Sequence, residues 1–324
     1  MILFISYKVY NEIMIEKFKY IKETNYSSEL ELINKKIHTS GEIVFPYIGF
    51  KKLREIVSKI NGMNIFPVSQ PSYSYIMYCH DGEKWVYYKT DRFGLRNNDK
   101  VWDESGIFLI NQDISKCSNM SFAEELQSKI GISVIDLTSR GENIIISLMK
   151  IVEFVPKDRL RLALIILSKE SFLNTKEFWD KNILERYIKE EGQNIKDLKT
   201  QIDDAIKQYL IDKINRKDIL SPIFKVYENL YSPWVLAEFL KTAFPKKQNI
   251  SKIDIEIGKF ILGRIIKFLG KEKSIFLFIG EERDNDRMKE IKDFLKSNGA
   301  KIKEIKDIKE LVNEINSIIS GDTK

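Results

Sequence analysis

From residue 106 onward, short apolar runs alternate with longer amphipathic stretches, and this rhythm constrains the fold more than any other feature of the chain. A short continuous apolar run is typical of a strand covered on both faces, and strands that alternate with helices form a parallel sheet between two helical layers. The sequence therefore predicts an α/β domain with three layers. Its predicted strands are Ile107–Ile110, Ile132–Leu137, Leu162–Leu167, Ser274–Ile279 and Ile302–Ile305.

Capping signals predict where the intervening helices begin and end. Ser121 and Glu124 have the Ser-x-x-Glu spacing of a capping box, and Gly131 is expected to end the helix that they begin. Asn174 is predicted to cap a helix whose apolar face includes Trp179. Further helices are predicted over 143–155, 253–269, 284–299 and 307–319.

Residues 1–104 are predicted to form an N-terminal extension of this domain. Apolar residues recur at helical spacing around 9–20 and 49–60, which predicts two helices. Aromatic and polar residues then alternate on both sides of Asp81-Gly82, which is typical of a β-hairpin with an Asp-Gly turn. The hairpin aromatics are expected either to pack on the domain or to offer flat rings to a sugar: they are Tyr73, Tyr75, Tyr78, Trp85, Tyr87 and Tyr88.

The stretch from about 194 to 250 is helical and less sheet-like than its surroundings. Pro222, Pro233 and Pro245 divide it into short pieces, because proline cannot continue a helix. We therefore expect a helical insertion or lid within an α/β domain that spans 105–324.

Charge and residue counts exclude several kinds of site. The 53 Lys and Arg against 47 Asp and Glu leave a net charge of +6 with the two signs interspersed, which is typical of a solvated surface and not of a nucleic-acid footprint. Two histidines, His38 and His80, are too few for a multi-histidine zinc site, and Cys79 and Cys117 are too far apart for a metal cluster or disulfide framework. Neither a GxxxxGKS/T loop nor a GxGxxG turn occurs, so no cofactor or metal is predicted.

The expected location is cytoplasmic. No run approaches the roughly 18 apolar residues needed to cross a bilayer. The apolar stretch at residues 1–6 is shorter than that of a signal peptide. The scarcity of cysteine fits a reducing compartment.

Four segments carry a resemblance to a known family. They are YYKTDRFGLRNNDKVWDESGIFLI at 87–110, FAEEL at 122–126, SVIDLTSRGEN at 133–143 and ILERYIKEEGQN at 183–194. In this order and spacing they resemble bacterial SGNH/GDSL-type hydrolase-like proteins of envelope-polysaccharide contexts, over about residues 65–210. The resemblance implies a parallel sheet of flavodoxin-like strand order that carries an ester-hydrolase site.

The resemblance also implies four catalytic blocks, and this chain departs from three of them. Asp113 stands at the nucleophile position of the first block, and Ser115 reaches it only if the loop is re-registered. Gly141 matches the glycine whose N–H helps to bind the oxyanion. Glu170 stands where an oxyanion-binding Asn is expected, and its charge would repel the oxyanion. The histidine of the fourth block is missing, because none follows His80.

These departures predict a catalytically degenerate protein that binds a glycan-related ligand or a partner protein in a polysaccharide pathway. One alternative is an active esterase or O-acyltransferase on acylated sugars, with a rearranged site that uses Asp113 or Ser115. Another is a Lys-rich interaction module.

Several polar residues remain where the predicted strands end, which is where open α/β sheets bind ligands. We expect them to form a repurposed pocket or, as the plainer alternative, to be helix caps and solvated loop residues. An acidic set drawn from them can hold a divalent cation, although the spacing does not demand one. The residues are Asp113, Ser115, Ser139, Arg140, Gly141, Glu142, Glu170, Glu281 and Glu282.

Overall fold

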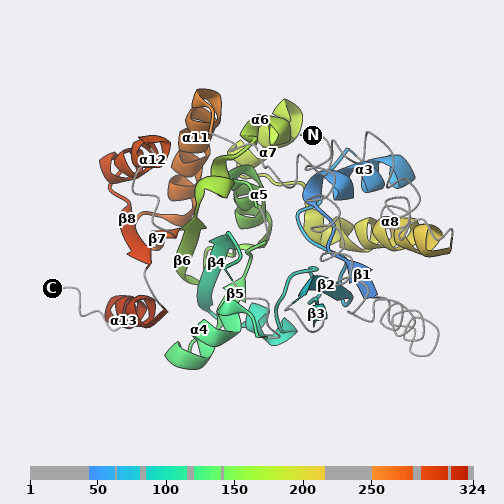
Figure 1. Ribbon diagram of the computed structural model, residues 1–324, viewed down its shortest axis with the longest axis horizontal. Helices are drawn as coiled ribbons and strands as arrows, with labels where there is room; N and C mark the ends of the chain where they lie inside the picture. The colour runs from blue at the N-terminus through green and yellow to red at the C-terminus, as the bar shows by residue number, and fades with distance from the viewer. Residues whose placement is uncertain are drawn as a thin grey trace, which may run out of the picture.

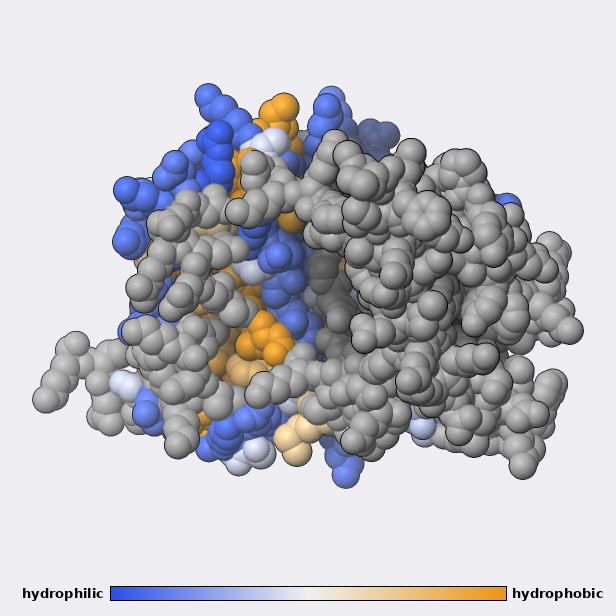
Figure 2. Space-filling view, viewed as in Figure 1, coloured by the Kyte–Doolittle hydropathy of each residue, from blue (hydrophilic) through white to orange (hydrophobic). Residues whose placement is uncertain are grey.

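The computed structural model describes residues 44–62, 64–80, 85–114, 120–139, 142–215, 250–279, 286–305 and 308–319. Within these ranges the chain forms a five-stranded sheet between helices and a three-stranded sheet beside it (Figure 1). The predicted helix at 9–20 and His38 lie outside the described residues. In the same view, hydrophilic residues dominate the described outer surface, and apolar residues show mainly between them (Figure 2).

The central sheet consists of parallel strands in the order β5-β4-β6-β7-β8. In chain order this is 2-1-3-4-5, the flavodoxin-like order. The strand that comes first in the domain therefore lies between the second and the third, and the sheet has a point where the strand order reverses. All five strands occur where short apolar runs predict them: β4 (Gly106–Asn111), β5 (Val134–Asp136), β6 (Leu160–Leu167), β7 (Ser274–Ile279) and β8 (Lys301–Ile305).

Helices cover both faces of this sheet, which confirms the predicted three layers. One face packs against α5 (Ile144–Phe154), α11 (Lys252–Leu269) and α12 (Asp286–Ser297). The other packs against α4 (Phe122–Ile130) and α13 (Ile308–Ile319). Successive side chains of a strand point to opposite faces and so enter different cores.

The capping box at the start of α4 forms as predicted. Ser121 Oγ accepts a hydrogen bond from Glu124 N at 3.1 Å, and Ser121 N donates to Glu124 Oε2 at 2.6 Å. The helix ends at Gly131, which has a left-handed backbone with φ 68°. A substitution at Ser121 therefore measures how much the capping box contributes to the stability of the domain.

Ser121→Ala should lower the free energy of unfolding by about 1 kcal/mol, because the substitution removes the acceptor for an N-terminal amide of the helix. Urea denaturation of the wild type and the variant measures this difference. Ser128→Ala, in an exposed part of the same helix, is the control and should change stability by less than about 0.5 kcal/mol. Equal effects of the two substitutions would contradict the prediction.

The N-terminal extension forms its own small sheet. The predicted hairpin is present, because β2 (Tyr75–His80) and β3 (Trp85–Lys89) pair antiparallel, and β1 (Val44–Pro46) adds to β2 in parallel. The predicted helix at its start is α3 (Phe50–Asn61). Residues 81–84, which contain the predicted turn, lie outside the described part of the chain.

The start of the predicted insertion is helical. Residues Ile195–Asn215 form one long helix, α8, which packs against α3. Lys199 Nζ donates to Gln70 O at 2.7 Å, and Ser72 N donates to Asp203 Oδ2 at 3.0 Å. These bonds join α8 to the extension. The prolines that predicted short pieces follow the end of α8 and lie outside the described residues.

The helix predicted after Asn174 is divided in two. Residues Thr175–Phe178 form α6 and Lys181–Ile188 form α7. Asn174 has a left-handed backbone and makes no side-chain cap, so its predicted capping role is wrong. Asp180 caps α7 instead. The break leaves Trp179 39% exposed.

The remaining short elements are two 3-10 helices, η1 (Asp99–Asp103) and η2 (Lys169–Phe172). Across the described ranges, no helix combines the length and the apolar character needed to cross a bilayer.

Candidate functional site

The carboxyl ends of β4 and β5 continue side by side beyond the strands themselves. Gln112 and Ser139 form an isolated parallel bridge, and Asp113 N donates to Ser139 O at 3.4 Å. β4 and β6 are neighbours on the other side, so this is where the strand order of the sheet reverses. Open α/β sheets bind ligands at such a point.

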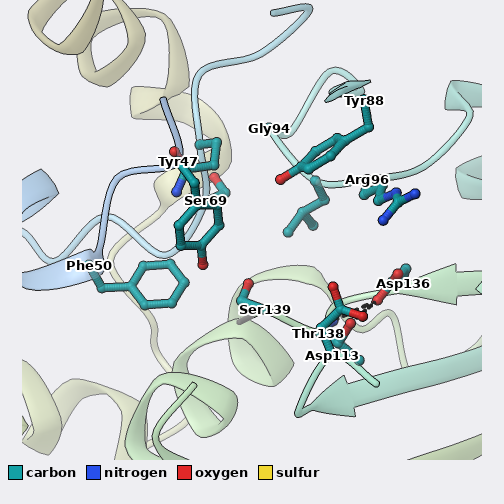
Figure 3. A pocket seen from close by; sticks show the side chains of 12 residues that line it. Tyr47, Phe50, Ser69, Tyr88, Gly94, Arg96, Asp113, Asp136, Thr138 and Ser139 are labelled. Atoms are coloured by element: carbon teal, nitrogen blue, oxygen red, sulfur yellow. Dashed lines mark hydrogen bonds between the residues drawn. The ribbon is translucent and has the colours of Figure 1, made fainter. Parts of the chain in front are cut away.

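A pocket lies at this edge, between the sheet and the N-terminal extension (Figure 3). The sheet contributes one wall, and the extension contributes the other. Two residues of the loop after β3, Gly94 and Arg96, lie on the extension side. The lining residues are Asp113, Asp136, Thr138 and Ser139 from the sheet, and Tyr47, Phe50, Ser69, Gln70, Tyr88, Gly94, Leu95 and Arg96 from the extension.

A buried carboxylate shapes the loop that forms the second wall. Asp91 Oδ1 accepts hydrogen bonds from Phe93 N at 2.8 Å and from Leu95 N at 2.9 Å. Its Oδ2 accepts from Trp102 Nε1 at 2.7 Å and from Asn97 Nδ2 at 3.1 Å. Burial nevertheless raises the pKa of Asp91. The Asp-Arg-Phe-Gly segment thus has a structural role in building the pocket wall.

Gly94 is required where this loop approaches the extension. Its backbone has φ 77°, and a Cβ at this position would lie 1.7 Å from Gln70 O. Asn97 joins the same loop to the sheet, because Asp136 N donates to Asn97 Oδ1 at 2.7 Å and Asn97 Nδ2 donates to Asp136 O at 3.1 Å. These contacts fix the two walls relative to each other.

Asp136 is a buried acid at the base of the pocket. Burial and, after it, the nearby charge of Asp113 raise the pKa of Asp136 to about 7. Hydrogen bonds from Thr138 N at 2.8 Å and Thr138 Oγ1 at 2.5 Å oppose this shift, as does Arg96. A carboxyl whose pKa is raised in this way suits a group that exchanges a proton or a hydrogen bond with a ligand.

A fully buried ion pair lies behind Ser139. Lys150, in the middle of α5, donates hydrogen bonds to Leu137 O at 2.6 Å, to Ser139 Oγ at 2.5 Å and to the carboxylate of Glu142. Both charged side chains have 0% exposure. Burial raises the pKa of Glu142 to about 7, although Lys150 opposes the rise. Lys150 Nζ also lies 5.2 Å from the ring centroid of Phe50.

A second buried network extends this polar centre toward η2. Asn111, the last residue of β4, has a left-handed backbone with φ 82° and is completely buried. Its Nδ2 donates to Ser147 Oγ at 2.9 Å, and its Oδ1 accepts from Ser171 Oγ at 2.8 Å. Ser147 Oγ in turn donates to Glu142 Oε1 at 2.8 Å. These bonds satisfy the buried groups and hold the strand end in place.

A second hollow continues the pocket along the hairpin. The two share Tyr88 and Arg96 among their lining residues and so lie next to each other; together they are called the groove below. Tyr73 and Tyr87 in the outer part are 59% and 40% exposed. The residues of the outer part are Tyr73, Tyr87, Tyr88, Lys89, Thr90, Asp91, Arg96, Asn97, Asn98, Asp99 and Glu124.

The structure brings some of the predicted site residues together and separates others. Asp113 and Ser139 line the pocket, and Glu142 lies directly behind it. Glu170 lies in η2, and its carboxylate accepts a hydrogen bond from Ser168 Oγ at 2.6 Å. It is not among the residues that line the pocket with Asp113. The predicted residues Ser115, Arg140, Gly141, Glu281 and Glu282 lie outside the described ranges.

Sequence reasoning missed three residues of this site. The apolar pattern predicts only a strand around Asp136, and Arg96 lies in one of the segments that carry the resemblance. Lys150 interrupts the apolar run of α5, and a charged residue within such a run is a signal that it has a buried partner. His80 ends β2 opposite Trp85, and no histidine lines either described hollow.

No group of three or more His, Cys, Asp or Glu residues is placed to hold a metal ion in the part of the chain that the structure describes. The site is thus a groove of tyrosines, carboxyls, amides and hydroxyls. Comparison of the chain with protein-family models, with curated proteins and with solved structures finds no match.

Proposed function

We propose that this protein binds a glycan-related ligand in the groove, and that it has lost the histidine-dependent ester hydrolysis of the SGNH/GDSL-type proteins that it resembles. The observation that carries the proposal is that the two hollows lie next to each other and share Tyr88 and Arg96. Exposed aromatic rings lie at one end of this groove, and buried polar groups lie at the other.

This combination suits the chemistry of a sugar. A sugar ring has an apolar C–H face, which packs on a flat aromatic ring, and a rim of hydroxyls, which need donors and acceptors. Tyr73 and Tyr87 offer exposed rings, and Asp99 and Asn98 lie beside them with polar side chains. Because a bound sugar keeps its hydroxyls paired in this way, the desolvation cost of burying them is offset.

The charges of the groove argue against a phosphate-rich ligand. Asp113 and Asp136 line the pocket, and Asp99 and Glu124 line the outer hollow, so that carboxyls outnumber the two lining cations, Lys89 and Arg96. These carboxyls would repel the phosphates of a nucleic acid, which proteins neutralise with Lys and Arg. A neutral or acylated saccharide fits the groove better than a polyanion does.

The proposed loss of the family's hydrolysis rests on the missing imidazole. A serine hydrolase needs a base to take the proton of its nucleophile, and no histidine lines the described groove. Asp113 stands where the resemblance implies the serine. A role in a polysaccharide pathway is implied by the resemblance alone and belongs to the same proposal.

Tyr87→Ala should weaken saccharide binding roughly five- to tenfold, because a lost aromatic contact corresponds to about 1 kcal/mol. Isothermal titration of the full chain with neutral and O-acylated oligosaccharides measures this effect. Phe260→Ala is the matched control, because Phe260 is also 40% exposed but lies on α11, away from the groove.

Two results would contradict the proposal. One is that every saccharide fails to bind the wild-type chain, which would favour a protein partner. The other is that Tyr87→Ala and Phe260→Ala bind the same saccharide as tightly as the wild type, which would place the ligand elsewhere.

A further inference from the structure

Ser139 differs from the other hydroxyls of the pocket in what lies behind it. Its side chain lines the pocket (Figure 3), and its Oγ lies 2.5 Å from Lys150 Nζ. The hydroxyl is also hydrogen bonded to the carboxylate of Glu142. Thr138, its neighbour, instead donates to the second pocket carboxyl, Asp136. Only Ser139 among these hydroxyls therefore contacts both a buried cation and a buried base.

We propose that Ser139, Lys150 and Glu142 form a nucleophilic centre without histidine, in which Ser139 Oγ takes an acyl group from an acylated saccharide. The proposal depends on the proposed function for the saccharide part of this substrate. The chemistry at Ser139 does not depend on it. It places the nucleophile on the loop after β5, and not at Asp113 or Ser115 after β4.

Lys150 has the geometry to stabilise the developing alkoxide. Its three N–H groups point to Leu137 O, to Ser139 Oγ and to Glu142, so the cation is fixed without help from solvent. A cation in a dry, preorganised site stabilises a developing negative charge more than it would in water. Serine paired with lysine is a known variant of the nucleophile and base arrangement.

Glu142 is the group that accepts the proton of Ser139. A general base is most effective when its pKa is near the working pH. Burial raises the pKa of Glu142 to about 7, which meets this condition. Ser147 Oγ holds the other oxygen of the carboxylate at 2.8 Å and so orients it. Ser147 is completely buried and does not line the pocket, which makes it a positioning residue.

The reaction balances with the groups named and one further alcohol or water. The Ser139 Oγ–C bond forms while the ester C–O bond to the sugar breaks. The proton of Ser139 passes to Glu142 and from there to the oxygen of the leaving sugar. Water then releases the acyl group as a carboxylic acid, or a second sugar hydroxyl takes it as a new ester, and the Ser139 hydroxyl is restored.

The test is covalent labelling of the full chain with an alkyl fluorophosphonate, followed by intact mass measurement and peptide mapping. We expect one adduct, at Ser139, which forms faster as the pH rises through 7. Ser139→Ala should abolish it, and Ser128→Ala, at an exposed position of α4, should retain it. Glu142→Gln should slow labelling about 100-fold or more and remove the pH dependence, because the base is gone.

A thiol at the same position gives a second measurement that does not depend on how the Ala variants fold. Ser139→Cys should react with iodoacetamide at least about tenfold faster at pH 7 than Thr138→Cys, which lines the same pocket beside the carboxyl of Asp136, because a cation beside a thiol favours the thiolate. Circular dichroism confirms that each variant is folded.

The proposal is overturned if the wild type forms no adduct between pH 6 and pH 9, if an adduct persists in Ser139→Ala, or if the two cysteine variants react alike. The fluorophosphonate carries no sugar, so labelling succeeds or fails independently of saccharide binding. Saccharide titration of Ser139→Ala, in which the groove is otherwise intact, tests the proposed function alone.

Discussion

Lys150→Met should lower the free energy of unfolding by about 3–5 kcal/mol at pH 8, because it leaves a buried carboxylate without its cation. Methionine has a similar length and can keep the contact with Phe50, so the loss is mainly electrostatic. Glu142 would then be a buried charge held by the hydroxyls of Ser147 and Ser139 without a cation. Leu137 O would also lose its donor from Lys150, which adds to the cost.

A double-mutant cycle isolates the interaction energy between Lys150 and Glu142. It compares, by urea denaturation, the free energies of unfolding of the wild type, Lys150→Met, Glu142→Gln and the double variant. The double variant should recover much of the lost stability, because it buries no unpaired charge. The loss in Lys150→Met should also shrink at pH 5, since Glu142 can take up a proton there. A double variant as unstable as the sum of the two single variants would contradict a direct interaction between the side chains.

The sheet and most of its helices could be predicted because their signals are local. Ser274 is followed by five consecutive apolar residues, and β7 (Ser274–Ile279) has the limits predicted from this run. Ser121 and Glu124 satisfy each other's backbone groups within one turn, so their spacing alone predicts the start of α4. Burial on both faces forces this kind of pattern on any parallel sheet.

Features set by contacts between distant segments could not be predicted in this way. The break between α6 and α7 lies where Arg54 pairs with Asp180, and Lys51 pairs with Glu177 at 2.5 Å. Both cations lie on α3, far away in sequence. The position of α8 against the extension is likewise set by tertiary bonds, such as that of Lys199 to Gln70. Helical spacing predicts a helix but not its neighbour.

In the candidate site, too, local patterns predict some residues and tertiary contacts determine the others. Asp113 and Ser139 could be placed at the edge of the sheet because each follows a predicted strand. The other wall comes from a segment whose shape depends on the buried Asp91 and on the close approach of Gly94 to Gln70. Nothing in the spacing of that segment shows which part of the sheet it meets. The family resemblance indicated its importance without indicating its structural role.

Asp136→Asn should gain stability relative to the wild type as the pH rises. Between pH 4 and pH 8, the difference in the free energy of unfolding between the two proteins should shift in favour of the variant by as much as about 4 kcal/mol. The pKa of Asp136 rises from 3.8 to about 7 on folding, so the folded chain holds this proton more tightly than the unfolded chain does. Its contribution to stability is therefore complete below pH 4 and is lost as the pH rises to about 7. Asparagine keeps an acceptor for Thr138 and has no charge to bury.

Urea denaturation at pH 4, 6 and 8 measures this difference as a change in slope with pH. A smaller slope should remain in Asp136→Asn, because the pKa of Glu142 also rises to about 7 and acts in the same direction. Asp113→Asn is the informative companion: removing its charge should lower the pKa of Asp136 and shift the loss of stability to lower pH. If Asp136→Asn and the wild type instead change in parallel from pH 4 to pH 8, burial does not hold the proton on Asp136. In that case the pocket would carry a permanent pair of charges, and a ligand with its own cation would fit it better than a neutral sugar.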